Sequence, residues 1–547
     1  MSHNHAALFD AVARAVPDRE AIVFGDRRLT YGRLLDRTNR LANALLDMGV
    51  RAPAPRSELA NWESRQDHVG LYLYNGNEYL EATCGANRAR AVPFNVNYRY
   101  VEHELAYLLN DASAAVIVYH EAFVPNLEAV LPKLDRQPRL LQVADGSGHG
   151  LLPDAVDYEE LLAGSTPDTP AAAPSPDDLY ILYTGGTTGM PKGTLWRQAD
   201  IYTAAIGGYA LTTGLDTSSL ESAAATAPGT TPTRLLPMPP FMHGAAGWAG
   251  LGGLLAGGTI VIPSAVTRLD PVDVLRTLER EHVQTVLMVG DAFARPLCEE
   301  LEKGGYDTSS LTVIVSGGAI LSPGMKERLL DLVPHALILD AGGASETGAQ
   351  LSSFTMKGQT AELAVFSPTD STFVVDAAKQ SAAEPGHEEP GWLVRRGAIP
   401  LGYLGDEAKT DATFPTVAGE RVSVPGDRAR LRADGLIELL GRESMTINSG
   451  GEKIFAEEVE QAIVRHPAVD DVLVVGRPSE RWGSEVVAVV QLHVGASASD
   501  EALLATASEQ IARYKLPKSI IRVPEVQRSP SGKADYAWAK QQVTERR

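Results

Sequence analysis

The spacing of apolar residues along the chain first predicts helices. In "TYGRLLDRTNRLANALLDMG" (30–49) apolar side chains recur every three or four positions, as one buried helix face requires. Gly49 closes this segment, as a C-terminal glycine should. The stretch "DPVDVLRTLEREH" (270–282) has a similar helical pattern. We expect both segments to be helices.

Short apolar runs rich in β-branched residues lie between the helix-like segments and predict buried strands. This alternation is typical of parallel sheets whose strands are joined by crossover helices. Several runs end in glycine or small polar residues, and ligands of open α/β sheets bind beyond the carboxyl ends of the strands. The runs are "HVGLYLYNG" (68–76), "AAVIVY" (114–119), "DLYILYTGG" (178–186), "GTIVIP" (258–263), "TVLMVG" (285–290), "TVIVSGGA" (312–319) and "ALILDAGGASE" (336–346).

The pattern changes after about residue 440. Two helix-like segments, 456–468 and 500–514, alternate with the strand-like runs 470–478 and 485–494. A chain of 547 residues exceeds the size at which one core stops growing. We therefore predict an α/β fold, with a large N-terminal domain of parallel sheets and crossover helices (1–442) and a small α+β C-terminal domain (443–547).

One long uncharged stretch raises the question of a membrane span. Between 235 and 267 the only ionisable side chain is His243, over a length that could cross a bilayer. The stretch also holds four prolines and many glycines, which argue against a continuous lipid-facing helix. We expect a buried strand, loop and helix beside a hydrophobic tunnel, and no membrane span.

Charge and cysteine content narrow the classes of function. A net charge of −20 argues against a nucleic-acid partner, although a local basic loop or a metal ion can still hold an anionic substrate. Cys84 and Cys298 are too few for a disulfide framework or a cysteine zinc site. The first twenty residues carry acidic side chains and lack the apolar core of a signal peptide. We expect a cytoplasmic protein.

The segment "YTGGTTGMPKG" (183–193) has the composition of a phosphate-binding loop. Its glycines let backbone amides approach an anion, and its threonines add hydroxyl donors. It differs from a Walker A loop, because its lysine lies between proline and glycine. A simple turn is the alternative for this segment taken alone. The candidate phosphate contacts are Thr184, Gly185, Gly186, Thr187, Thr188, Gly189 and Lys192.

Five further segments follow this loop in a fixed order. They are "SGGAIL" (316–321), "GGASETG" (342–348), "VPGDRAR" (424–430), "GRESMTINSGGEKIFAEEVE" (441–460) and "RSPSGKADY" (528–536). Together the six motifs resemble those of the adenylate-forming superfamily, which includes acyl-CoA synthetases, luciferases and the adenylation domains of peptide synthetases. Gly185 stands where serine is common, and this form resembles bacterial fatty-acyl and steroid-acyl CoA ligases.

The resemblance implies roles for individual residues. Lys533 would catalyse adenylation, Glu346 would bind Mg²⁺ and Asp427 would bind the ribose hydroxyls. A lysine and a metal ion supply the positive charge that adenylation of a carboxylate by ATP requires. The other implied nucleotide contacts are Gly317, Gly318, Ala319, Gly342, Gly343, Ser345 and Arg442.

The resemblance also implies a mobile C-terminal domain that turns about Ser444. It would present Ser449, Gly450 and Gly451 to CoA, and His243 would orient the reacting carboxylate. For the acyl pocket we single out residues near His243 and in "MVGDAFARP" (288–296), for which plain core packing is the alternative. They are Gly247, Trp248, Val289, Asp291 and Phe293.

Three positions depart from the family pattern. Gly342 replaces a tyrosine that often stacks on adenine, Ser444 replaces a charged hinge residue, and Asn448 stands where a lysine is often found. These departures resemble those of the steroid- and fatty-acyl ligases, and they predict that base stacking is weaker or comes from elsewhere.

The predicted reaction joins a hydrophobic carboxylic acid, such as a medium- or long-chain fatty acid or a steroid side-chain acid, to CoA with ATP and Mg²⁺. An acyl-AMP ligase that loads a carrier protein or another nucleophile is the alternative. A luciferase-like oxygenase and a non-catalytic binding protein also stay open, although Glu346 and Lys533 are both retained. The partners are then small molecules, and a homodimer is left open.

Overall fold

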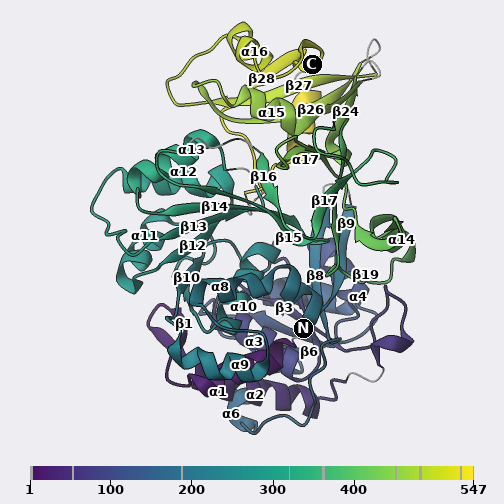
Figure 1. Ribbon diagram of the computed structural model, residues 1–547. Coiled ribbons are helices and arrows are strands. Elements are labelled where there is room, and N and C mark those ends of the chain that lie inside the picture. Colours follow the sequence, from purple (N-terminus) through teal and green to yellow (C-terminus); the bar gives the residue numbers. More distant parts are fainter. Residues whose placement is uncertain are drawn as a thin grey trace.

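The structure is a computed structural model that describes residues 4–51, 55–186, 189–319, 321–359, 362, 364–387, 389–449, 452–479, 483–529 and 532–545. Two large sheets and their helices occupy the lower and middle parts of Figure 1, and the C-terminal unit lies above them. The chain passes from one part to the other through the short 3-10 helix η6 (Glu443–Met445).

The first sheet carries the glycine- and threonine-rich loop. Its strand order is β19-β9-β8-β4-β3-β5-β6-β7, and the strands from β8 to β7 run parallel. Strand β9 turns back antiparallel on β8, so the loop between them is a hairpin tip. The strands are β3 (His68–Tyr72), β4 (Val92–Asn95), β5 (Val116–His120), β6 (Arg139–Val143), β7 (Ala155–Asp157), β8 (Leu179–Gly186), β9 (Gly189–Arg197) and β19 (Gly402–Tyr403).

The second sheet begins with a parallel half. Strands β1, β11, β10, β12, β13 and β14 are neighbours in that order, with β2 antiparallel at the edge. Their bounds are β1 (Glu20–Phe24), β2 (Arg27–Thr30), β10 (Arg234–Pro237), β11 (Thr259–Ile262), β12 (Thr285–Met288), β13 (Val313–Gly317) and β14 (Leu337–Ala344).

Beyond β14 the same sheet continues with mostly antiparallel strands. They carry the chain from the candidate magnesium ligand to the end of the large domain. They are β15 (Gly348–Thr355), β16 (Val365–Pro368), β17 (Thr372–Val375), β18 (Gly391–Arg396), β20 (Thr416–Val417), β21 (Glu420–Ser423), β22 (Asp427–Leu431) and β23 (Ile437–Arg442).

Helices pack between and around the sheets (Figure 1). Every residue of α3 is buried, and α3 shares one large core with α2 and α10. These helices and the others near the site are α1 (His5–Ala15), α2 (Tyr31–Asp47), α3 (Asn77–Arg88), α4 (Glu102–Asp111), α7 (Gln198–Ala204), α10 (Gly244–Leu255), α11 (Pro271–Glu281), α12 (Gly290–Leu301), α13 (Pro323–Leu332) and α14 (Glu407–Thr413).

The C-terminal unit has its own sheet and its own apolar cores. The sheet has the order β25-β24-β27-β26, and β28 pairs in parallel with β27. The elements are β24 (Thr446–Ser449), β25 (Glu452–Phe455), α15 (Ala456–Ile463), β26 (Val469–Ser479), β27 (Gly483–Leu492), α16 (Asp500–Ser508), β28 (Ser519–Arg522) and α17 (Tyr536–Glu545).

The predicted fold class is confirmed. The helix expected at 30–49 is α2, which the Thr30 hydroxyl caps by accepting from the Arg33 N–H. The uncharged stretch 235–267 forms β10, a loop, α10 and β11, as expected. In the part of the chain that the structure describes, no helix is both long enough and apolar enough to cross a membrane.

Candidate active site

A buried asparagine at the end of β4 holds the phosphate-loop hairpin where β8 leads into it. The Asn95 side chain accepts the Tyr183 N–H at 2.8 Å and donates to the Tyr183 carbonyl at 2.7 Å. It also donates to the Met242 carbonyl at 2.7 Å. Asn95 therefore fixes the start of the hairpin and the residue before His243 relative to each other.

The hairpin places most of the predicted phosphate contacts at its tip. Thr184 pairs with Lys192, and Gly186 pairs with Gly189, with a register shift at Gly185. The Lys192 Nζ lies 3.9 Å from Asp406 Oδ2. Thr187 and Thr188 lie outside the described residues. The phosphate contacts of this loop therefore stay a prediction.

His243 precedes α10 and is positioned by a second buried asparagine. Asn75 accepts the Phe241 N–H at 2.6 Å and donates to the Pro239 carbonyl at 3.1 Å. The His243 Nε2 is buried and has no hydrogen-bond partner among the described residues. Burial, Lys533 and Arg99 lower the pKa of His243 to about 3, so its ring is neutral at working pH. A buried, unsatisfied ring nitrogen is suited to receive a ligand.

The predicted adenine-binding turn follows β13. Gly318 adopts φ +88°, a conformation that glycine accepts without strain. A Cβ built on Gly317 would stand 3.1 Å from the Ala341 carbonyl oxygen, so this turn packs tightly on β14. Ala319 is partly buried against the core of α12 and α13.

The glycine pair of β14 is required by backbone packing. A Cβ on Gly343 would stand 2.1 Å from the Gly348 carbonyl oxygen, which excludes any side chain there. A Cβ on Gly342 would face Leu351 at 3.1 Å. The carbonyl of Ser345 accepts from the Trp196 indole N–H at 2.9 Å, which ties this turn to β9.

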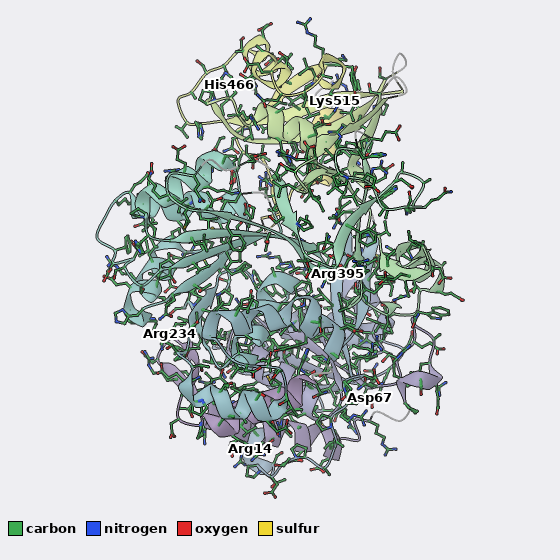
Figure 2. All side chains as sticks on the ribbon, in the orientation of Figure 1. Arg14, Asp67, Arg234, Arg395, His466 and Lys515 are labelled. Atoms are coloured by element: carbon green, nitrogen blue, oxygen red, sulfur yellow. The ribbon has the colours of Figure 1, made fainter. Side chains whose placement is uncertain are left out.

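Glu346 follows this turn and is oriented by a tyrosine that we did not predict. The Tyr403 hydroxyl donates to Glu346 Oε1 at 2.7 Å, and the Ser423 hydroxyl donates to the Glu346 carbonyl at 2.6 Å. Arg395, labelled near the middle of Figure 2, is buried and donates to the carbonyls of Ala349 and Ala398. The turn that presents Glu346 is therefore braced on both sides.

Asp427 and Arg442 lie side by side at the end of the large domain, because β22 and β23 pair there. Their ion pair joins Arg442 Nε to Asp427 Oδ1 at 3.2 Å. Asp427, followed by Glu346 and Glu457, raises the pKa of Arg442. Glu457 lies in the first turn of α15, and burial followed by the Asp427 charge raises its pKa to about 7.

The lysine loop of the C-terminal unit reaches into this group. A Cβ built on Gly532 would stand 3.1 Å from the Val289 side chain, and one on Gly318 would stand 4.0 Å from Lys533 Cε. Lys533 is solvent-exposed, although the surrounding protein partly desolvates its ammonium group. Burial and then Arg442 lower the pKa of Lys533, and Glu346 acts in the opposite direction.

The predicted hinge lies in the connection between the two parts, and the predicted CoA contacts follow it in the chain. Ser444 is the middle residue of η6. Ser449 is buried and pairs with Glu452 and Gly483, both in the C-terminal sheet. Gly450 and Gly451 lie outside the described residues. The structure brings Lys533 to the Gly318 turn of the large domain.

The five predicted acyl-pocket residues have different surroundings. A Cβ on Gly247 would stand 2.7 Å from the Phe241 carbonyl oxygen, so this glycine serves close packing. Trp248 packs half-buried against the core, and Val289 is buried under Gly532. Asp291 accepts the Ser322 N–H at 2.7 Å, and burial raises its pKa. Phe293 lines a cavity.

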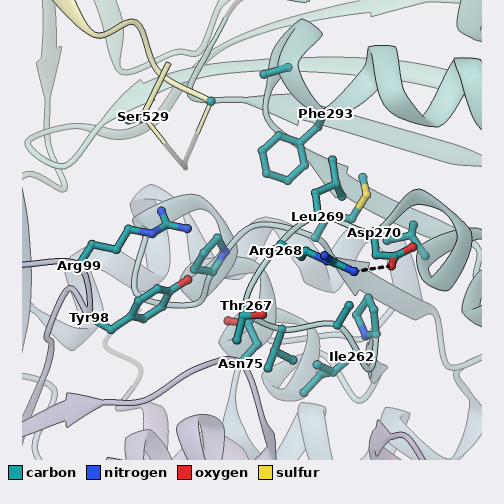
Figure 3. Close-up of a pocket in the computed structure, with 18 residues that line it drawn as sticks. Asn75, Tyr98, Arg99, Ile262, Thr267, Arg268, Leu269, Asp270, Phe293 and Ser529 are labelled. Carbon is teal, nitrogen blue, oxygen red and sulfur yellow. Dashed lines mark ion pairs between the residues drawn. The ribbon is translucent and has the colours of Figure 1, made fainter. Parts of the chain in front are cut away.

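That cavity has a volume of about 200 Å³ and lies between the two domains. Figure 3 shows Phe293 and Leu269 on one side, Tyr98 and Arg99 on the other, and Ser529 of the C-terminal unit above. Pro240 also lines it, so the cavity begins next to the segment that carries His243. Its volume is below the usual range of about 300–1,000 Å³ for ligand pockets.

Asn75, Asn95 and Tyr403 are site residues that the sequence interpretation missed. The two asparagines end or follow buried strands, and the rule that small polar residues at strand ends mark a ligand edge could have found them. For Tyr403 the local sequence carries no such signal, because it reaches Glu346 only through the long-range pairing of β19 with β9.

Comparisons with known proteins agree with this geometry. Models of two families match the chain, the AMP-binding enzyme over residues 9–404 and the AMP-binding enzyme C-terminal domain over 458–533.

Two curated relatives are similar over nearly the whole chain. "Medium-chain acyl-CoA ligase Mig" of Mycobacterium avium is 53% identical over 540 residues, covering 98% of each chain. "Medium/long-chain-fatty-acid--CoA/3-oxocholest-4-en-26-oate--CoA ligase" of Mycobacterium tuberculosis is 40% identical, over 99% of this chain and 96% of that one.

Among solved structures, ATP-bound MatB from Rhodopseudomonas palustris has the same fold. The TM-score is 0.78 at 23% identity, with 98% of each chain covered. The chain therefore belongs to the AMP-binding enzyme family, within the adenylate-forming superfamily.

Proposed function

We propose that this protein is an AMP-forming ligase that joins a hydrophobic carboxylic acid to CoA. The observation that carries the proposal is the position of Lys533, which reaches from the C-terminal unit to the Gly318 turn of the large domain. Its ammonium group shares one electrostatic environment with Arg442 and Glu346. A cation at this junction suits a reaction that accumulates negative charge at a phosphorus atom.

In the first half-reaction a carboxylate oxygen of the acid forms a bond to the α-phosphorus of ATP. The bond from that phosphorus to the bridging oxygen breaks, and pyrophosphate leaves with the electron pair. His243 stays neutral, so it can orient the carboxylate through its free Nε2 without adding charge. Asp427 would accept from the ribose hydroxyls, since it lies at the start of β22 beside Arg442.

In the second half-reaction the sulfur of CoA bonds to the acyl carbon of the adenylate. The bond from that carbon to the AMP oxygen breaks, AMP leaves with the electron pair, and the thiol proton passes to solvent. We propose that the C-terminal domain turns about Ser444 between the two halves. Ser529 and Gly532 close the cavity between the domains in this structure, so the same rotation would open it.

Glu346 is the residue that would bind Mg²⁺. Among the described residues no three His, Cys, Asp or Glu side chains gather as a metal site. Mg²⁺ is usually held by one or two carboxylates together with substrate phosphates, so a single carboxylate fits. When bound, the ion would neutralise phosphate charge. We expect Glu346→Gln to weaken adenylation and to raise the Mg²⁺ concentration needed for half-maximal rate.

The acid is expected to be apolar. The two bacterial relatives are named for medium-chain, long-chain and steroid side-chain acids, and apolar side chains such as Met238, Val266 and Phe293 line much of the cavity. Each buried methylene can contribute about 0.8 kcal/mol, or roughly fourfold in affinity. Specificity constants should therefore rise steeply from acetate to medium-chain acids.

The test is pyrophosphate release from a series of acids, from acetate to hexadecanoate and a steroid side-chain acid, followed by product analysis with CoA. A preference for acetate or for an amino acid would contradict the apolar-acid proposal. Acyl-adenylate that accumulates with CoA present, but is consumed by a carrier protein, would favour the acyl-AMP ligase instead. We also propose a cytoplasmic location, which cell fractionation tests.

A further inference from the structure

A second lysine stands beside the phosphate loop without any role in the reaction described above. Lys409 is in α14, directly after β19, and β19 pairs with β9 of the loop hairpin through Tyr403 and Thr194. The Leu404 N–H donates to the Gly193 carbonyl at 2.8 Å. Helix α14 is therefore attached to the strand that carries Lys192.

The backbone of Lys409 is fixed by local hydrogen bonds. Asp406 caps α14 by accepting the Lys409 N–H at 2.9 Å. The Thr410 hydroxyl accepts the Tyr403 N–H at 2.9 Å and donates to the Asp406 carbonyl at 2.7 Å. These bonds fix the start of α14, from which the Lys409 side chain extends.

The Lys409 side chain points to the same place as Lys192 and Glu346. Its Nζ lies 4.9 Å from the centre of the Tyr403 ring, and the hydroxyl of that ring donates to Glu346. Lys192 Nζ lies 3.9 Å from Asp406, the cap of the same helix. In the described part of the chain Lys409 itself forms no ion pair with a carboxylate.

The ammonium groups of Lys409 and Lys192 are close neighbours and repel each other. Burial, followed by the contact with Lys192, lowers the pKa of Lys409 to about 8. Glu346 and Asp406 oppose this shift, but Glu346 is already bonded to Tyr403. Such a pair becomes favourable when an anion with several oxygens lies between the two groups.

We propose that Lys409 is a second phosphate-binding cation, which together with Lys192 holds the β- and γ-phosphates of ATP and the pyrophosphate that leaves. This inference rests on the proposed adenylation reaction. Lys192 approaches the phosphates from the hairpin, and Lys409 approaches them from α14. Lys409 thereby makes the site select a triphosphate over AMP.

The experiment is a set of binding titrations with α,β-methylene-ATP, inorganic pyrophosphate and AMP. In Lys409→Ala we expect the affinity for the ATP analogue to fall about tenfold, the loss typical of one charge-assisted hydrogen bond. The affinity for pyrophosphate should fall by a similar factor, and the affinity for AMP should stay within about twofold of the wild-type value. Lys409→Arg should keep most of the affinity, because it keeps the charge.

A matched control is Lys303→Ala, at an exposed lysine that follows the C-terminal end of α12 and pairs with Glu300. It should bind all three ligands like the wild type. Unchanged affinity for the ATP analogue in Lys409→Ala would overturn the proposal, and so would equal losses for AMP and the ATP analogue. If Lys409→Ala unfolds, Lys409→Gln and Lys409→Arg decide the question between them.

These titrations need neither the acid nor CoA. A wild-type protein that binds the ATP analogue but forms no acyl-CoA from any acid would overturn the proposed function, while the comparison of nucleotides at Lys409 would still stand. The two proposals therefore fail by different observations.

Discussion

The large domain and the C-terminal unit contribute to the site in different ways. In the large domain Asn95 forms three buried hydrogen bonds to two segments of the site, at 2.7–2.8 Å. The C-terminal unit brings Lys533 to the same site through a glycine against Val289 and an ion pair between Arg295 and Asp470. The large-domain part of the site is thus built into the fold, and the Lys533 part is held by contacts between the two domains. We call them the built-in half and the docked half.

This difference indicates how one site can serve two reactions. Interfaces between domains allow motion unless they are large and hydrophobic. A partly exposed ion pair is worth about 1 kcal/mol or less, so releasing the lysine loop has a low energetic cost. Breaking the Asn95 bonds instead leaves buried polar groups without partners. The predictions below test this contrast.

The largest expected effect is on adenylation in Lys533→Ala. Removing a charge-stabilising group from a site of this type usually lowers the rate by about 10²–10³. Formation of acyl-CoA from a pre-made acyl-adenylate should change by no more than about threefold, because the proposed rotation takes Lys533 out of the site in that half. Single-turnover measurements of each half-reaction check this.

Lys540→Ala is the matched control for Lys533→Ala, since Lys540 is an exposed lysine of α17. It should leave both half-reactions unchanged. Equal losses in the two halves of Lys533→Ala, with unfolding temperatures like the wild type, would contradict a loop that docks for one half only.

Asn95→Ala should damage both half-reactions and the stability together. It leaves the Tyr183 N–H and two carbonyls without partners, which costs about 2–3 kcal/mol of the free energy of unfolding. Asn43→Ala is the control, because Asn43 also donates to two backbone carbonyls but through solvent-exposed hydrogen bonds. Urea denaturation of both variants measures the difference. If Asn95→Ala were as stable as the wild type, the Asn95 hydrogen bonds would not hold this part of the site in place.

The sequence predicted individual helices and strands well, but it predicted poorly which of them come into contact in the folded protein. The helix expected at 30–49 is α2, and the strand expected at 312–319 contains β13. The helix expected at 500–514 stops at Ser508, because Glu509 and Gln510 add no apolar side chain to hold a further turn against the sheet. Periodicity reports such local features directly.

The candidate site was predicted through motif order, and each motif identifies only its own segment. Glu346, Arg442 and Lys533 could be named in this way, and the structure places them in one electrostatic environment. Tyr403 and Lys409 could not, since they join the site because β19 pairs with β9, some two hundred positions earlier in the chain. No local pattern in the sequence reports such a pairing.

A third prediction concerns His243, which the docked Lys533 helps to keep neutral. Its pKa of about 3 in the folded protein lies below the ordinary value of about 6.5. Between these two pH values His243 is therefore protonated in the unfolded chain and neutral in the folded protein. The free energy of unfolding is therefore unaffected by this protonation above pH 6.5, and it falls as the pH decreases from 6.5 towards 3. At pH 5 the loss is about 2 kcal/mol.

The measurement compares the free energy of unfolding of the wild type and His243→Gln at pH 7.5 and pH 5. The wild type should lose about 2 kcal/mol more than the variant over this interval. In Lys533→Ala the acid-dependent loss should be smaller, because one of the charges that lower the His243 pKa is gone. A wild type and a His243→Gln variant with parallel pH profiles would show that His243 titrates normally.

The smallest expected effect is at the ion pair between the domains. Arg295 in α12 pairs with the Asp470 carboxylate in β26 and also donates to the Asp470 carbonyl at 2.9 Å. Both side chains keep some exposure, 23% and 13%, so the pair should stabilise the docked arrangement by about 1 kcal/mol or less. Arg295→Ala should therefore slow adenylation about two- to fivefold and leave the thioester half unchanged or slightly faster.

Arg276→Ala, which removes an exposed arginine of α11 paired with Glu279, should alter neither half. A substitution at Arg295 is cleaner than one at Asp470, because Asp470 also contacts Gln491 and His493 within its own domain. If Arg295→Ala slowed both half-reactions equally, the pair would stabilise the fold rather than one of its two arrangements, and the contrast between a built-in and a docked half would lose its support at this contact.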